Sequence, residues 1–312
     1  MFGNIACLPT PTPTGPYSWG DAYPSCHPIV GAHHSPINLD GNMARNDSLG
    51  GVHLEGFQGV HAGEWRLKNN GHSVVLELGG GMAVMGGGLP GTYQTLQLHF
   101  HWGSSTTNGS EHTLDSRRYP MEVRHNPERG EAVLSNTGNI VAFRHGLAPG
   151  GVAAQIQASR AVTSRLWALV AVFSCHLGKM SILVEDYGKT VTVKPFPLLN
   201  LLPAQNLSQF YRYHGSLTTP PCSQAVMWTV FEVPIYVSQQ QINAFTSGIY
   251  QSEEGANKTL LQRNFRHIHE TFSREVLASR DATLIPVSAV ASARSALALV
   301  LFALLLLPTW LP

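Results

Sequence analysis

The segment QLHFHW, residues 97–102, decides how this chain folds. In a β-strand, side chains two residues apart point to the same side, so His99 and His101 would lie side by side with Gln97 next to them. The apolar residues between them would face a hydrophobic core. This arrangement supplies two imidazoles of a three-imidazole metal site. Histidines that are exposed or satisfied in a core are the commoner explanation of such a pair, so the metal prediction depends on the rest of the chain.

Short apolar runs recur about every ten residues, separated by Gly, Pro and Asn. The runs at residues 74–76, 96–102, 166–173 and 226–233 predict strands. Glycine triplets at 79–81 and 86–88 bracket residues 82–85, which we expect at the edge of a hairpin. Residues 238–250 carry apolar side chains at helical spacing behind a serine cap and predict one amphipathic helix. The chain is therefore expected to be mainly β (α+β).

Composition excludes several classes of protein. The 312 residues include 30 Gly and 20 Pro, which disfavours a coiled coil or a long helical bundle. Lys and Arg number 20 against 19 Asp and Glu, and no run of five like charges occurs. We therefore expect no nucleic-acid partner and no electrostatic attraction to an anionic membrane surface. A β-rich chain of this length can fold around one core, so we expect one domain with tails.

The two ends differ from the middle of the chain. Residues 1–16 are rich in Pro and Thr and carry no evident signal peptide, and we favour a true start that lies elsewhere. Residues 282–312 hold a spacer of small residues followed by twelve apolar residues at 296–307, fewer than the about 20 that span a bilayer. This pattern predicts a glycosylphosphatidylinositol (GPI) anchor signal. A buried core helix and a short single-pass anchor are the alternatives.

Four sequons and four cysteines bear on the compartment. The sequons predict glycosylation at Asn46, Asn108, Asn206 and Asn257. The cysteines form no CxxC pair, which argues against a zinc ribbon or a redox motif and allows disulfides in an oxidising compartment.

Around the HxH pair, a series of segments resembles the α-carbonic anhydrases. They fall in the family's order between residues 17 and 281, which we expect to be the domain. The matching segments are SPIN at 35–38, NNGH at 69–72, GTY at 91–93, QLHFHWG at 97–103, GSEHTLD at 109–115, YPMEV at 119–123, YHGSLTTPP at 213–221 and WTVF at 228–231. The membrane-anchored extracellular branch looks nearest.

The resemblance implies a single domain around a large, mostly antiparallel twisted central sheet with a few short peripheral helices. It also implies zinc-dependent, reversible hydration of carbon dioxide to bicarbonate and a proton, with small-molecule substrates. In that branch a disulfide joins the N-terminal region to the residue after the TTP turn, here Cys26 with Cys222. The protein would lie on the extracellular face of the plasma membrane, held by a lipid anchor, and its oligomeric state stays open.

The same resemblance assigns roles to individual residues. His99, His101 and a third imidazole would hold Zn²⁺ and lower the pKa of a bound water to about 7. Thr218 would accept a hydrogen bond from the resulting hydroxide and donate to Glu111. Thr219 would lie at the bicarbonate position, and an apolar wall for carbon dioxide would consist of Leu217, Val226 and Trp228. Gln97 and Glu122 would accept hydrogen bonds that orient the imidazoles. His72 would be the proton shuttle, and the alternative is that it is an ordinary surface histidine.

The pattern breaks at the third zinc ligand. The family has Glu-x-His, whereas here Glu122 is followed two residues later by Arg124. On a regular strand the Arg124 guanidinium would point at the metal and His125 would point away, unless a bulge turns His125 inward. Residues 124–165 do not match the family, as a mispredicted exon or a retained intron would cause. His125 or water is left as the third ligand.

Three interpretations of function therefore stand. The first is a zinc-dependent carbonic anhydrase. The second is a catalytically impaired carbonic-anhydrase-related binding module, which Arg124 favours because arginine stays charged and cannot ligate zinc. The third is an unrelated β-barrel metalloprotein, which only the HxH pair supports.

Overall fold

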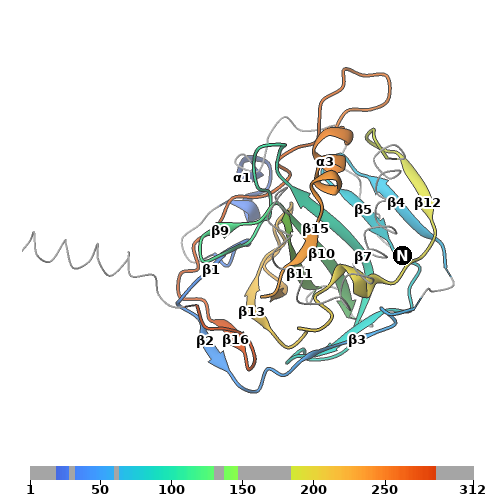
Figure 1. Cartoon of the computed structure of the whole chain (residues 1–312). Helices are drawn as coiled ribbons and strands as arrows, with labels where there is room; N and C mark the ends of the chain where they lie inside the picture. Colours follow the sequence, from blue (N-terminus) through green and yellow to red (C-terminus); the bar gives the residue numbers. More distant parts are fainter. Residues whose placement is uncertain (1–18, 28–31, 60–62, 130–136, 147–183, 286–312) are drawn as a thin grey trace, which may run out of the picture.

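Strands dominate the chain in its computed structural model, which describes residues 19–27, 32–59, 63–129, 137–146 and 184–285 (Figure 1). The elements are α1 (Trp19–Ala22), η1 (Pro24–Cys26), β1 (Asn38–Leu39), β2 (Ala44–Asn46), β3 (Val52–Glu55), β4 (Trp65–Asn69), β5 (Val74–Glu77), β6 (Ala83–Gly86), β7 (Tyr93–Trp102), β8 (Thr113–Leu114), β9 (Arg117–Arg118), β10 (Met121–Arg129), β11 (Thr137–Gly146), β12 (Thr190–Val193), η3 (Leu198–Leu201), β13 (Phe210–Gly215), β14 (Val226–Phe231), β15 (Ile235–Val237), α3 (Gln239–Gly248) and β16 (Val276–Ser279).

One sheet of 13 strands organises the described residues (Figure 1). Its main path is β12-β4-β5-β7-β10-β11-β14-β13-β16-β2, while β3, β6 and β15 attach beside it. Most neighbours are antiparallel, and β11 runs parallel to β14 and β15, as β16 does to β2. Strands β1, β8 and β9 form a small separate sheet. The prediction of a mainly β fold with a large, mostly antiparallel sheet and few short helices is confirmed.

The pairing of β7 with β10 brings the functional residues of two strands to one face. Arg124 lies opposite His99, and Glu122 lies opposite His101. Residues directly opposite in an antiparallel pair point to the same side of the sheet. The register shifts between Asn126 and Pro127, beyond these pairs. Arg124 and Glu122 therefore share the face of the two histidines.

The other face of β7 packs into the hydrophobic core, as its alternating pattern predicts. Leu98, Phe100 and Trp102 are at most 2% exposed. Helix α3 covers this face, and the Phe245 ring centroid lies 5.2 Å from those of Phe100 and Trp102. Burying each such side chain contributes roughly 1.5–3 kcal/mol. The core thus fixes which side of β7 presents the imidazoles.

The predicted helix and several predicted strands are confirmed within the described residues. The helix predicted at 238–250 is α3, where Ser238 and Gln241 form a capping box. Strands β5, β7 and β14 lie where apolar runs predicted them, and β6 forms an antiparallel pair with the following β7 at the predicted hairpin. Strands β10 and β11 show that the stretch without a family match contributes to the sheet. The strand predicted at 166–173 lies outside the described residues.

Candidate active site

The two imidazoles of the HxH pair lie together on β7. The ring centroids of His99 and His101 are 5.1 Å apart. His101 is buried, and its Nδ1–H donates to the backbone oxygen of Asn264 over 2.6 Å, which leaves Nε2 3.6 Å from Glu111 Oε2. Burial lowers the pKa of both rings, that of His101 to about 3. Both are therefore neutral near pH 7, the form in which imidazole binds metals.

The Arg124 guanidinium occupies the pocket beside this pair. The residue is 1% exposed, and its Nε donates to Glu122 Oε1 over 2.7 Å. One terminal nitrogen donates to Thr218 Oγ1, and the other forms an ion pair with Glu111. Its Cζ atom lies 4.6 Å from the centroid of the Trp228 ring. The expectation that Arg124 points into the site is confirmed.

Two buried carboxylates balance this charge in different ways. Burial alone would raise the pKa of Glu122, but the Arg124 cation and His112 hold it well below its usual range. Glu122 also accepts the backbone N–H groups of Glu111 and His112, both over 2.8 Å. Burial raises the pKa of Glu111, and Arg124 opposes that rise. The carboxylates in turn raise the pKa of Arg124 against the effect of burial, so the guanidinium stays charged.

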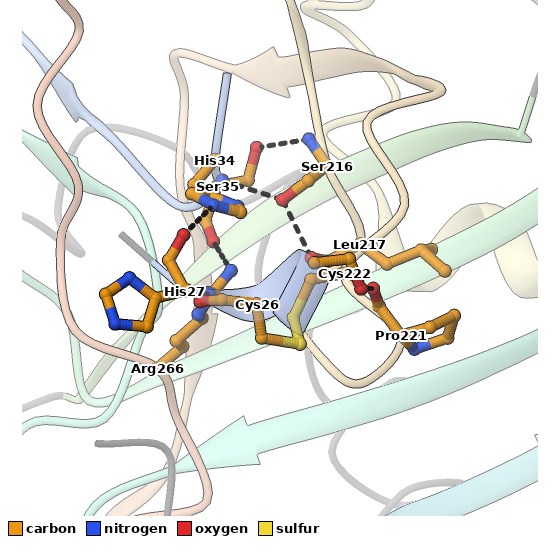
Figure 2. The surroundings of a disulfide bond; sticks show 10 residues. Cys26, His27, His34, Ser35, Ser216, Leu217, Pro221, Cys222 and Arg266 are labelled. Atoms are coloured by element: carbon orange, nitrogen blue, oxygen red, sulfur yellow. Dashed lines mark hydrogen bonds between the residues drawn. A yellow bond between two sulfur atoms is a disulfide. The ribbon is translucent and has the colours of Figure 1, made fainter. Parts of the chain in front are cut away.

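A disulfide holds the turn that carries Thr218 and Thr219. Cys26 and Cys222 are bonded, as the resemblance implied, and Figure 2 shows the bond beside Leu217. The Cys222 N–H donates to the oxygen of Thr219 over 2.9 Å, which closes the turn. Thr218 is buried and faces the pocket, whereas Thr219 is exposed.

Two of the three residues expected to form an apolar wall lie on β14. Val226 and Trp228 are buried at alternate positions of this strand, so they share a face, and Leu217 packs beside them half-buried. The Trp228 Nε1–H donates to Ser216 O over 3.2 Å, which fixes the indole. Because Arg124 lies over this ring, the guanidinium also covers part of the wall.

Comparison with known proteins places the chain in a family. A sequence model of the eukaryotic-type carbonic anhydrases matches residues 14–280. The chain belongs to this family. Carbonic anhydrase 4 of Oryctolagus cuniculus is 35% identical over 286 residues, 89% of this chain and 82% of the relative. Carbonic anhydrase 15 of Mus musculus is 32% identical over 281 residues, 86% and 81% of the two chains, and carbonic anhydrase 12 of Homo sapiens is 30% identical over 273 residues, 86% and 71%.

The pocket does not fit the zinc site of a carbonic anhydrase as it stands. Within the described ranges, no three His, Cys, Asp or Glu side chains are arranged to hold a metal ion. Arginine has no lone pair to offer and its charge repels a cation. Since Arg124 also forms an ion pair with Glu111, the nearest carboxylate to His101 is already engaged.

The assignment of His125 as the third ligand is corrected by the strand register. His125 lies opposite Leu98 and therefore on the core side of the sheet. It is fully buried, and its ring centroid is 5.9 Å from that of Phe57. The bulge that could have turned it inward is absent from this part of β10, because the register shift comes after Asn126.

The supporting residues of the carbonic anhydrase pocket lie partly elsewhere than expected. Glu122 contacts Arg124 and His112. Gln97 is half-buried, and no hydrogen bond joins it to either imidazole of the pair in the described structure. His72 is exposed on the turn between β4 and β5. An exposed imidazole there is available to exchange protons with solvent.

Two positioning residues escaped the sequence reasoning. Asn264 accepts from His101 through its backbone oxygen, while its side-chain amide donates to His72 O over 3.0 Å and accepts from the Trp102 N–H. The Arg266 N–H donates to Glu111. Both residues follow α3 in a segment without regular strand or helix pattern. Their partners are far away in the sequence: Asn264 and His101 are separated by 163 positions, and Arg266 and Glu111 by 155. No local signal identifies them.

The structure describes the four sequons but not the apolar tail. Asn108 and Asn257 are exposed, whereas Asn46 and Asn206 are half-buried, with Asn206 Nδ2 donating to Gln209. Across the ranges that the structure describes, no helix has the length and hydropathy to cross a membrane. The apolar segment at 296–307 lies outside those ranges.

Proposed function

We propose that this pocket is built for the reversible hydration of carbon dioxide to bicarbonate and a proton, and that Arg124 suppresses the reaction in this chain. The observation that carries the proposal is the hydrogen bonding of Thr218. Its hydroxyl accepts from the Arg124 guanidinium, which also forms an ion pair with the Glu111 carboxylate. The family's hydroxide would donate to the same oxygen. The Arg124 N–H therefore takes the place of that donor.

The same side chain interferes with the substrate position. The wall formed by Val226 and Trp228 offers no hydrogen bond to the linear, apolar carbon dioxide molecule, so it can hold it without competition from water. With the Arg124 Cζ atom 4.6 Å from the Trp228 ring, a cation covers that wall. Arg124 alone thus blocks metal ligation, occupies the acceptor oxygen of Thr218 and covers part of the substrate wall.

Replacing Arg124 with histidine tests this proposal. In the Arg124→His variant, three imidazoles would share one face of β7 and β10, and zinc content should rise toward one per chain with measurable carbon dioxide hydration. Zinc is measured by plasma mass spectrometry on protein purified without chelator, and hydration by stopped-flow pH change. The matched control is Arg124→Lys, which keeps the charge and should gain neither. A zinc-free, inactive Arg124→His variant would refute the proposal.

A carbonic-anhydrase-related binding module is the second candidate function. The specific observation in its favour is that Arg124 is bonded to Glu111, Glu122 and Thr218, so these carboxylates are paired with a cation that is not a metal. Wild-type protein without zinc and without hydration above the uncatalysed rate would support this function. Residual zinc-dependent turnover in the wild type would exclude it.

We further propose that the protein is held on the extracellular face of the plasma membrane by a lipid anchor. The disulfide supports an oxidising compartment, and the small-residue spacer with its short apolar tail supports a GPI signal. A phosphatidylinositol-specific phospholipase should release the protein from intact cells into the medium. Retention in the membrane pellet would contradict the anchor.

A further inference from the structure

Three histidines outside this pocket form a second cluster. The ring centroids of His34 and His269 are 5.1 Å apart, and those of His267 and His269 are 4.4 Å apart. His34 is 2% and His269 7% exposed, and His267 is half-buried. The cluster joins segment 32–37 to segment 266–274 near the end of the domain.

Hydrogen bonds run alongside these rings and tie the two segments together. The His269 N–H donates to Pro36 O over 2.9 Å, and Arg274 donates to His34 O over 2.7 Å. Figure 2 shows the Arg266 side chain reaching the backbone oxygens of Ser35 and Cys26, over 3.1 and 3.0 Å. Every acceptor is a backbone carbonyl, and the nearby Glu111 carboxylate offsets part of the Arg266 charge.

The groups around the cluster are predominantly cationic or neutral. Burial lowers the pKa of His269 most, and the charges of Arg266 and Arg274 and the other two imidazoles lower it further. From the N-terminal part of the chain, His27 contributes its carbonyl to His34, and His33, which precedes His34, is exposed. From β13, Tyr213 lies with its ring centroid 5.7 Å from Arg274 Cζ, and His214 offers its backbone oxygen to the same arginine. Glu270 is exposed and accepts from Arg274 through its backbone.

Hydrogen bonding in the cluster suits neutral rings. His34 Nε2–H donates to His27 O over 2.9 Å. Among the described residues, neither Nδ1 of His34 nor Nε2 of His269 has a hydrogen-bond partner. A protonated ring would bury an N–H without an acceptor, which is costly. A metal ion is disfavoured too, because two arginines flank the rings and no metal-holding group occurs in the described ranges.

We propose that His34, His267 and His269 form an acid-sensitive latch, which holds segments 32–37 and 266–274 together while the rings are neutral and opens when they take up protons. Opening would also release Glu111, because the Arg266 N–H that binds it belongs to the latch. The proposal concerns the fold of this chain and does not depend on the reaction proposed above.

The sign of the effect follows from burial. Desolvation lowers the pKa of all three histidines in the closed state, that of His269 to about 2. The open state therefore binds more protons, so the closed state is fully favoured above about pH 6.5 and loses stability as pH falls. From pH 7.5 to 5.5, each histidine that stays neutral when closed increases the opening equilibrium constant about tenfold.

Hydrogen exchange measured by mass spectrometry tests the latch on the full chain. Exchange of peptides covering residues 32–38 and 264–275 is compared at pH 7.5 and 5.5 after division by the intrinsic rate at each pH. We expect opening in the wild type to rise by at least about tenfold. The triple variant His34→Gln/His267→Gln/His269→Gln should lose most of this rise. His53→Gln, at an exposed position on β3, is the control and should behave as the wild type.

Two results would overturn the proposal: a wild-type rise below about twofold, or a triple variant that keeps the full rise. Should the triple variant fail to fold, an NMR titration of the wild-type imidazoles decides the matter. Rings of His34 and His269 that titrate in the folded protein near the ordinary value of about 6.5 would refute the latch, and rings that stay neutral down to the onset of opening would support it.

Discussion

Replacing Arg124 with methionine removes a buried cation from two carboxylates. Glu122 keeps His112 and two backbone N–H donors, so the loss falls mainly on Glu111. Removing one partner of a buried ion pair costs about 3–5 kcal/mol, because the other charge stays buried without compensation. A domain of this kind is stable by about 5–15 kcal/mol, so the variant should fold but unfold at clearly lower urea concentration.

The pH dependence of this loss identifies its cause. Burial already raises the pKa of Glu111 in the wild type, and without Arg124 it rises further. A carboxyl whose folded pKa lies above its unfolded value binds more protons when folded, so stability falls as pH rises through that window. The free energy lost by Arg124→Met, measured by urea unfolding monitored through tryptophan fluorescence, should therefore be larger at pH 7.5 than at pH 5.5.

Two comparisons make the result decisive. Adding Glu111→Gln to Arg124→Met removes the stranded charge and should recover about 1–3 kcal/mol of the loss. Arg280→Met, which breaks an exposed ion pair with Asp281, should cost less than about 1 kcal/mol. A loss for Arg124→Met as small as that for Arg280→Met, or one equal at both pH values, would refute the reasoning.

The helix cap, the disulfide and the exposed sequon each give one further test. Ser238→Ala removes the acceptor that caps α3 and should lower the free energy of unfolding by about 1 kcal/mol in urea titrations. Reducing the Cys26–Cys222 bond, which closes a loop with a sequence separation of 196, should cost about 3–5 kcal/mol, and a variant with alanine at both positions should be insensitive to reductant. In protein secreted from mammalian cells, Asn257→Gln should increase gel mobility through loss of a glycan, whereas Asn206→Gln, at a half-buried amide, should leave mobility unchanged.

The parts of the fold that sequence predicted are those fixed by local pattern. Period-two alternation across 97–102 correctly assigned the faces of β7, since burial of alternate residues is a local property. The same reasoning correctly directed Arg124 into the pocket. The serine cap and the apolar spacing of residues 238–250 gave the position of α3 to within two residues. The order of strands in the sheet has no such local signal, because it arises from pairings between segments far apart in the chain.

The sequence predicted which residues form the site, but not which of them bond to one another. The family match named Thr218, Glu111 and Glu122, yet their bonds depend on where Arg124 places its three nitrogen groups. His125 failed as a ligand because the bulge on β10 comes only after Asn126, beyond His125, and bulge positions are set by pairing with the neighbouring strand. Asn264 contributes a backbone oxygen, which carries no information about residue type.

Arg124 supplies a positive charge where the proposed zinc site would have one. In the proposed zinc site, the metal and a hydroxide would together leave one net positive charge beside Thr218 and Glu111. Arg124 supplies one positive charge among the same groups, bonded to Thr218 and paired with Glu111. A neutral residue at this position would have removed the ligand and left the carboxylates uncompensated. Under the proposed function, arginine at position 124 would remove a zinc ligand while preserving the local charge balance, so the carboxylates remain compatible with a folded, buried pocket.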